Sequence, residues 1–489
     1  MAELTPMMQQ YMETKKQYQD CILFYRLGDF YEMFFDDALK ASKELEITLT
    51  GKSCGLEERA PMCGIPYHAV DGYLTKLVSK GYKVAICEQV EDPKLAKGIV
   101  KREVVRIVTP GTNLNMQSLE ETKNNYLMCI AYGDKIGISV IDVTTGDFFV
   151  TQVENTKNLF DEIIKFSPAE IICNDAFMLS GFDLEDLRSR LGITVYQLDS
   201  WYFDDDTCQN RIKKHFHVQT MTALGIDSFS MGTIAAGAIL NYLYETQKTS
   251  LSHITHINPY ITSKYMLLDS STRRNLELCE TLREKQKRGS LLWVLDKTKT
   301  AMGARTLRSY IEQPLIDKED ITLRLDAVEA LFSNAIGREE LREYLNPIYD
   351  LERLLGKVSY KTANPRDLIA FSKSLEMLPS IRTVLADFKD SQLLQRICDD
   401  IDPLEDICGL IEQAIEEEPP ISIRDGGMIK TGFNEDVDHF RNAKTDGKNW
   451  LAQLELEQKE RTGIKNLKIG YNKVFGYYFE VTNSFKEMV

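Results

Sequence analysis

The sequence predicts a multidomain chain that is mixed α/β in its first half and mainly α-helical after about residue 260. The 489 residues are enough for three or four domains. Apolar runs of strand length alternate with helical patterns up to about residue 250. Long helical patterns punctuated by prolines then follow to about residue 420. We expect four domains, at residues 1–115, 116–255, 256–425 and 426–489.

The first domain should combine strands and helices. Thr5-Pro6 is typical of a helix start, since proline is favoured at the first helical position. A helix is predicted from Asp29 to Leu45, where apolar residues recur at helical spacing. Further predicted elements are strands at Cys21–Leu27, Tyr82–Cys87 and Val104–Val108 and a helix at Tyr73–Ser79.

The later domains differ in character. The second should hold a hairpin over Lys135–Val150, strands at Glu170–Cys173 and Ile193–Tyr196, and a buried helix at Ile234–Tyr244. The third should hold long helices, for example Thr272–Arg288 and Asp320–Leu331. The fourth should hold a polar helix, Asn449–Glu460, and a β-rich segment, Leu467–Thr482. The long helices suit a lever or stalk better than a compact catalytic core.

The net charge of −15 taken alone argues against a nucleic-acid partner, but binding depends on local patches. Three stretches are basic against this background, at Lys94–Arg106, Arg283–Arg308 and Lys459–Lys473. A single basic stretch is often only a solvent-exposed helix or loop face. Three such stretches in an acidic chain favour a separate, positively charged binding surface. No run of 18 apolar residues and no signal peptide is present, so a cytoplasmic protein without a membrane segment is expected.

Metal chemistry has little support in the sequence. The ten cysteines form no Cys-x-x-Cys pair, and Cys54 and Cys63 have only His68 nearby. We expect reduced thiols, no metal site and no catalytic residue.

The segment Gly28-Asp29-Phe30-Tyr31-Glu32 is the most informative motif, and it allows two interpretations. Asp29 and Glu32 have the spacing of a capping box at a helix start, with Phe30 in the core. Alternatively, Phe30 is a wedge that enters the minor groove and unstacks a base step. A mispaired step costs less to deform, so such a wedge would prefer defects without reading sequence. Glu32 would then accept a hydrogen bond from the displaced base.

Several motifs in order along the chain resemble the bacterial MutS mismatch-repair family. Gly28–Phe34 resembles its Phe-x-Glu motif, and Gly64–Ala69 its Gly-Ile-Pro-Tyr-His-Ala loop. The resemblance continues at Val84–Gln89, Arg106–Thr112, Leu268–Leu278, Met302–Pro314, Glu460–Gly463 and Tyr471–Tyr478. It spans essentially the whole chain and favours the wedge interpretation.

The resemblance implies a mismatch-recognition domain, an RNase H-like connector, a long-helix lever and an incomplete β-rich clamp. Phe30 would stack on the mispaired base, Glu32 would hydrogen-bond it, and Met62 is a weaker minor-groove candidate. Asn472 and Lys473 lie on the segment that meets the DNA backbone in the family. Lys465 and Lys468 are added from their charge alone. The implied partners are double-stranded DNA with mismatches or small loops, a second subunit and MutL, at the nucleoid.

The family also carries a C-terminal ATPase, and these 489 residues depart from that pattern. Gly51-Lys52-Ser53 has the tail of a phosphate loop, but position 46 is Glu where the motif needs Gly. ATP and magnesium are therefore expected only for a C-terminal domain outside this sequence, and this chain is not expected to be an enzyme.

Two other classes of function stay open from the residues. A nuclease could use Asp142 and Asp147 near the predicted hairpin, although two acids there are more often turn residues. A scaffold could bind partner proteins through the helical region without touching DNA. Metal-dependent cleavage and salt-sensitive DNA binding separate these classes.

Overall fold

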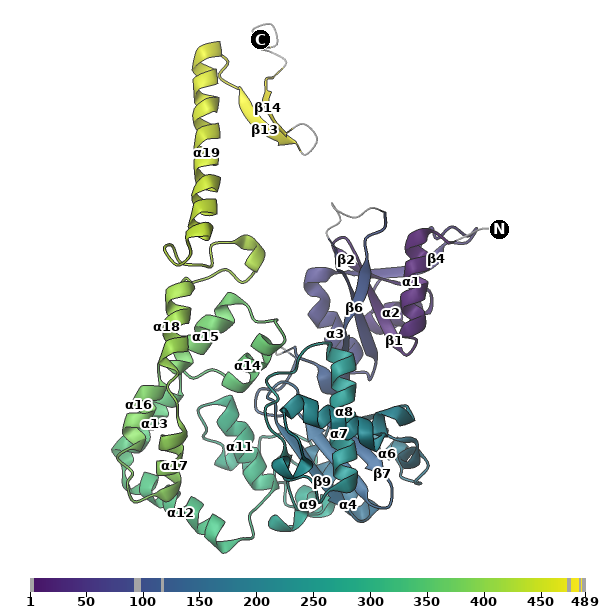
Figure 1. Cartoon of the computed structure of the whole chain (residues 1–489), viewed down its shortest axis with the longest axis vertical. Helices are drawn as coiled ribbons and strands as arrows, with labels where there is room; N and C mark the ends of the chain where they lie inside the picture. The colour runs from purple at the N-terminus through teal and green to yellow at the C-terminus, as the bar shows by residue number, and fades with distance from the viewer. Residues whose placement is uncertain (1–3, 92–97, 116–117, 473–475, 483–484, 486–489) are drawn as a thin grey trace. The chain divides into compact units, whose positions relative to one another are not determined.

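Figure 1 shows the computed structural model, which describes residues 4–91, 98–115, 118–472, 476–482 and 485. The chain forms two compact units. The first unit comprises Met1–Ala363 and Lys373–Pro403, and the second comprises Asn364–Ser372 and Leu404–Val489. Among the described residues, no helix is both long and apolar enough to cross a membrane.

The first sheet has six strands in the order β3-β4-β2-β1-β5-β6. Its strands are β1 (Cys21–Leu27), β2 (Phe30–Phe34), β3 (Thr50–Lys52), β4 (Ala60–Pro66), β5 (Lys83–Gln89) and β6 (Arg102–Val108). Only β1 and β5 pair in parallel. The helix α1 (Pro6–Gln17) packs on one face through Met8 and Tyr11. The helices α2 (Phe35–Leu45) and α3 (Val70–Val78) pack on the other face, and the short η1 (Tyr67–Ala69) precedes α3.

The sheet corrects one predicted element. Strand β1 has the predicted bounds, but the helix predicted from Asp29 begins only at Phe35, because Phe30–Phe34 forms β2. Tyr31 and Phe34 have the spacing of one helix face, but strand pairing on both sides of β2 places them on opposite faces of the sheet, where both are buried.

The second sheet also has six strands, in the order β11-β10-β7-β8-β9-β12. They are β7 (Leu127–Tyr132), β8 (Ile136–Ile141), β9 (Phe148–Val153), β10 (Glu170–Cys173), β11 (Thr194–Gln197) and β12 (Asn258–Pro259). Helices α7 (Asp205–Phe216) and α8 (Ser230–Gln247) cover one face; α4 (Thr156–Phe166), α5 (Asp175–Met178) and α6 (Leu184–Leu191) cover the other. Short turns η2 (Pro110–Thr112), η3 (Ser200–Phe203) and η4 (Met221–Leu224) connect these elements. The predicted hairpin, strands and buried helix are confirmed.

Helices make up the rest of the first unit. They are α9 (Ser270–Asn275), α10 (Leu291–Leu295), α11 (Ala301–Glu312), α12 (Lys318–Ser333), α13 (Ala335–Leu345), α14 (Leu351–Ser359), α16 (Leu378–Leu385) and α17 (Gln392–Asp400), with η5 (Thr262–Lys264) before them. The helix predicted over Asp320–Leu331 is confirmed as α12. The one predicted over Thr272–Arg288 is wrong, because α9 ends at Asn275 and both Glu277 and Lys285 have positive φ.

The second unit contains α18 (Glu405–Ala414), α19 (Glu435–Thr462) and the hairpin of β13 (Lys468–Asn472) with β14 (Gly476–Glu480). The helix α15 (Pro365–Leu375) begins in this unit, and Leu368 and Phe371 of α15 pack against Ile411 and Ala414 of α18. The short η6 (Ile423–Asp425) lies between α18 and α19. The polar helix and the β-rich segment predicted near the C-terminal end of the sequence are confirmed.

Candidate nucleic-acid interface

The turn between β1 and β2 places Phe30, and several contacts fix it. Leu27 pairs with Phe30, so Gly28 and Asp29 form a two-residue turn. Gly28 has φ of +59°, which glycine adopts without strain. The Arg26 Nε donates to the Gly28 carbonyl at 2.5 Å, and the Tyr67 amide donates to the Asp29 carbonyl at 3.0 Å. The turn is therefore held from both sides.

Phe30 is not a core residue, although its strand is well anchored. Its side chain is 47% exposed, whereas Phe34, four residues later on the same strand face, is buried against Tyr11 of α1 with ring centroids 4.9 Å apart. On the opposite face Tyr31 is buried and donates to Glu88. Burial, together with that hydrogen bond, raises the pKa of Tyr31. The strand thus carries an exposed aromatic side chain on a rigid base, and the core interpretation of Phe30 is wrong.

The three residues predicted to contact DNA at the mismatch lie on one face of this sheet. Phe30, Glu32 and Phe34 alternate along β2, and Met62 of β4 pairs directly with Phe34. Met62 is half-buried, and the Thr50 hydroxyl donates to its carbonyl at 3.2 Å. The fold therefore brings Phe30, Glu32 and Met62 onto a common surface, with Phe30 the most exposed of the three.

Glu32 does not cap a helix, so the capping-box interpretation is wrong. It lies in the middle of β2, and the next helix begins three residues later at Phe35. Its carboxylate instead pairs with Lys52 of β3, with Nζ 2.5 Å from Oε2. Lys52 was noticed in the sequence only as the tail of a rejected phosphate loop. Its position in β3, which is followed directly by strand β4 and not by a helix, agrees with that rejection.

Two of the four residues predicted to contact the DNA backbone lie on the hairpin of the second unit. Lys468 and Asn472 are on β13, four residues apart and so on the same face, and both are exposed. Lys465 is exposed in the loop before β13. Lys473 lies outside the described residues. The hairpin follows α19, whose C-terminal end is closed by Gly463 in the left-handed conformation.

Two of the basic stretches contribute less free charge than the sequence indicated. In the first, Arg102 donates to the Arg26 carbonyl at 2.7 Å, and Arg106 donates to the Thr112 carbonyl at 3.1 Å. In the second, Arg305 is buried between carboxylates, and Lys287 pairs with Asp296. These guanidinium and ammonium groups hold the fold together, so charge counting along the sequence overestimated the binding surface.

The acids of the second domain hold a turn. Asp142 is fully buried, and its Oδ1 accepts from the Thr144 amide and hydroxyl while Oδ2 accepts from the Asn125 amide. Asp147 accepts from the Thr145 hydroxyl at 2.9 Å, and burial raises its pKa. Both carboxylates are engaged by local donors, which favours the turn interpretation over a nuclease centre.

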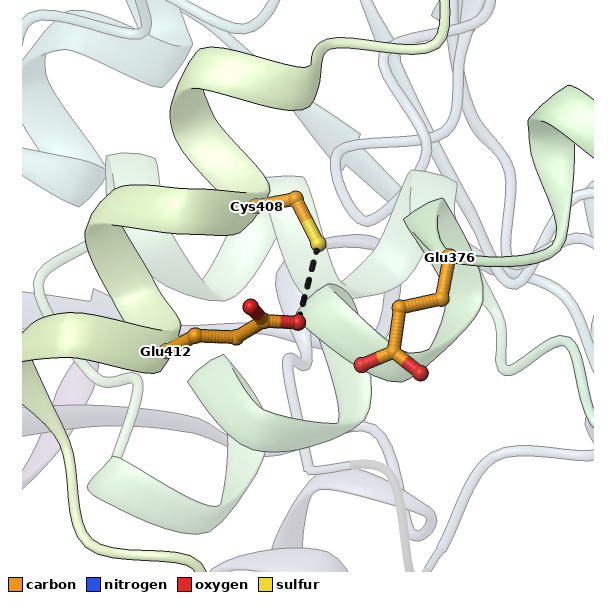
Figure 2. Close-up of side chains that lie close together, drawn as sticks. All are labelled: Glu376, Cys408 and Glu412. Carbon is orange, nitrogen blue, oxygen red and sulfur yellow. Dashed lines mark hydrogen bonds between the residues drawn. The ribbon is translucent and has the colours of Figure 1, made fainter.

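The cysteines considered as metal ligands in the sequence do not come together. Cys54 and Cys63 are buried in different clusters, on opposite faces of the first sheet. Figure 2 shows Cys408 and Glu412, one turn apart on α18, with the thiol donating to Oε1 at 3.6 Å. Glu376, also drawn there, belongs to the first compact unit. The Cys408–Glu412 contact is local to one helix, and we assign no metal to it.

The fold defines a modular protein in which two α/β domains precede a helical region and a hairpin. Models of MutS domain I, domain II and domain III match residues 5–117, 125–255 and 271–473. The chain belongs to the MutS family.

Relatives agree along the whole chain. It is 66% identical over its full length to the DNA mismatch repair protein MutS of Lachnoclostridium phytofermentans, covering 52% of that protein. It is 53% identical over its full length to the MutS proteins of Ruminiclostridium cellulolyticum and Acetivibrio thermocellus, covering 56% of each. The chain thus spans about half the length of the curated relatives it matches.

Proposed function

We propose that this chain recognises mismatched or unpaired bases in duplex DNA during mismatch repair. The observation that carries the proposal is Phe30, an exposed aromatic ring at the start of a strand whose turn is fixed by Arg26 and Tyr67. The naming of the relatives as mismatch-repair proteins supports it.

In this proposal Phe30 enters the minor groove at the defect. Unstacking a base step costs a few kcal/mol, and stacking of a base on an aromatic ring returns about 1–3 kcal/mol. A mispaired step is already weakened, so the balance favours insertion there. A rigid β-hairpin limits the entropy lost when the ring is ordered against the base.

Glu32 then supplies the polar part of the recognition. It lies two residues from Phe30 on the same strand face, so its carboxylate can accept a hydrogen bond from the base that Phe30 displaces. Against a matched duplex, which offers no such donor, the carboxylate would be repelled by phosphates. Glu32 therefore penalises binding to matched DNA. Met62, on the same face, is proposed as an apolar groove contact.

The hairpin of the second unit is proposed to hold the DNA backbone. Lys465 and Lys468 would neutralise phosphates, and Asn472 and Lys473 would contact the same backbone. Such contacts give affinity that falls with salt and carry no sequence information.

The proposal also covers the assembly, the partner protein, the location and the cofactors. We propose that the protein acts as a homodimer around the duplex, recruits MutL, and works at the nucleoid in the cytoplasm. ATP and magnesium are assigned to the portion of the family that lies outside these 489 residues, and no residue of this chain is given a role in binding them.

Paired titrations test the proposal against its rivals. Affinity is measured for matched duplex and for the same duplex with one mismatch, at several salt concentrations. We expect tighter binding to the mismatch and a linear fall of log affinity with log salt. Equal affinity for both duplexes would contradict mismatch recognition. No salt-sensitive binding would favour the scaffold, and metal-dependent cleavage would favour the nuclease.

A further inference from the structure

The ion pair between Lys52 and Glu32 links two strands that do not pair with each other. Lys52 is on β3 and Glu32 on β2, and β4 lies between them. The Lys52 Nζ is 2.5 Å from Glu32 Oε2 and 5.6 Å from the centroid of the Phe34 ring. The two side chains are 33% and 17% exposed, so the pair lies at the edge of the surface that carries Phe30.

We propose that Lys52 positions and neutralises Glu32, and that this pair limits how strongly the protein penalises matched DNA. The inference rests on the proposed function, because it takes Glu32 as the carboxylate that meets the base. Lys52 is a positioning residue in this account: it acts through Glu32 and does not contact the base.

The geometry leaves Glu32 ready to accept one further hydrogen bond. Lys52 occupies Oε2, and among the described residues no donor is assigned to Oε1. A carboxylate held at one oxygen loses rotational freedom, so its second oxygen is presented in a narrow range of directions. This pre-organisation favours recognition of a donor on a displaced base.

The effect of the Lys52–Glu32 pair on DNA affinity increases when DNA covers this surface. Displacing water lowers the effective dielectric, so repulsion between Glu32 and phosphates increases, and so does the attraction of Lys52. With Lys52 present, much of the charge on Glu32 is cancelled. Without Lys52, a bare carboxylate would face the polyanion, and only a mismatch with a hydrogen-bond donor would offset part of that cost.

The test is a double-mutant cycle on the full chain. Lys52→Met removes the charge but keeps much of the side-chain length; Glu32→Gln removes the partner's charge; the double variant closes the cycle. Affinities for matched and mismatched duplex are measured at one salt concentration, with melting curves for each variant. Lys52→Arg tests whether a different side chain with the same positive charge maintains binding. Lys80→Met is the matched control, because Lys80 pairs with Glu44 at 2.8 Å on another part of the same domain.

We expect Lys52→Met to weaken binding to matched duplex about tenfold, equivalent to about 1.4 kcal/mol, and to mismatched duplex only about threefold. Discrimination therefore rises about threefold. When Glu32 is already Gln, Lys52→Met should weaken the affinity for each of the two duplexes only about twofold. Lys52→Arg and Lys80→Met should stay within about twofold of wild type, as for exposed charges.

One result overturns the inference while leaving the proposed function intact. If wild type discriminates between the duplexes, but Lys52→Met costs the same factor with Glu32 and with Gln at position 32, Lys52 is an independent phosphate contact. If wild type does not discriminate at all, the proposed function itself fails. Equal melting temperatures for the variants exclude unfolding as the cause of either result.

Discussion

We predict that the stability of the helical region depends strongly on the buried guanidinium of Arg305. Its side chain is only 4% exposed. Nη1 donates to Asp350 at 2.6 Å and to the Glu121 carbonyl at 2.9 Å, and Nη2 donates to Asp350 at 2.8 Å and to Glu352 at 2.6 Å. One guanidinium thus joins α11 to the start of α14 and to the segment that precedes β7.

Replacing Arg305 by Met should destabilise this part of the first unit by about 3 kcal/mol. Removing one partner of a buried ion pair costs about 3–5 kcal/mol, because the other charge is left unpaired. We take the low end because Glu352 is 42% exposed, so that water can solvate it, and because Asp350 keeps Arg353 Nε at 3.8 Å. Arg305→Lys keeps the charge but loses the two-pronged geometry, so about 1–2 kcal/mol is expected.

Hydrogen–deuterium exchange of α11 and α14 measures this locally. A loss of about 3 kcal/mol accelerates exchange roughly a hundredfold, since each 1.4 kcal/mol is a factor of ten. Arg308→Met is the matched control, because Arg308 is on the same helix and, within the described part of the chain, its ion pair is an i,i+4 contact of 3.5 Å with Glu312. If Arg305→Met changed exchange no more than Arg308→Met, Arg305 would not be the joining residue described above.

Three further predictions concern the second domain and the sheet face that carries Phe30. Burial lowers the pKa of His215 and His253 below the usual 6.5, so the folded state keeps both neutral while the unfolded state takes up protons. The contribution of these two histidines to the free energy of unfolding should therefore be constant above about pH 7 and decrease as pH falls below 6.5. Replacing both, as His215→Gln with His253→Gln, should flatten the dependence of stability on pH between about 7 and 5 in urea titrations. Gly137→Ala would place a Cβ 1.9 Å from the Met231 carbonyl oxygen, which should destabilise by about 3 kcal/mol or more in thermal melts. Gly133→Ala, whose nearest neighbour is the movable Met231 Cε at 2.8 Å, should cost much less; equal costs would contradict the close backbone approach. Glu32→Gln should tighten binding to matched duplex, narrow the mismatch preference and barely change the melting temperature; a large loss of stability would count against the role assigned to Glu32.

The sequence was most informative where one element has one clear pattern. Mainly apolar runs predicted β1 and β10 with their observed bounds. It failed where a helix-like spacing lies in a strand that is buried on both faces, as at Tyr31 and Phe34, since strand pairing is decided by neighbours outside the segment. It also failed where Glu277 and Lys285, both with positive φ, interrupt an apparent helix.

The residues of the candidate site also divide into those that the sequence predicted and those that it did not. Phe30 and Glu32 were predicted from a local motif together with a family resemblance, and neighbouring positions on one strand then fix their common face. Lys52 could not be predicted, because its pairing with Glu32 depends on the order of β3, β4 and β2 in the sheet. The sequence also counted Arg305 as surface charge, since local composition does not reveal that Asp350 and Glu352 surround it.

The most direct test of the central claim is the ratio of affinities for mismatched and matched duplex in Phe30→Ala, with Phe332→Ala as control. Phe332 is an exposed phenylalanine on α12, outside the surface that carries Glu32 and Met62, so it matches the loss of an exposed ring. The wedge account predicts that Phe30→Ala brings the ratio to about one while salt-dependent binding to matched duplex persists. Phe332→Ala should leave the ratio unchanged. An unchanged ratio in Phe30→Ala would contradict the account.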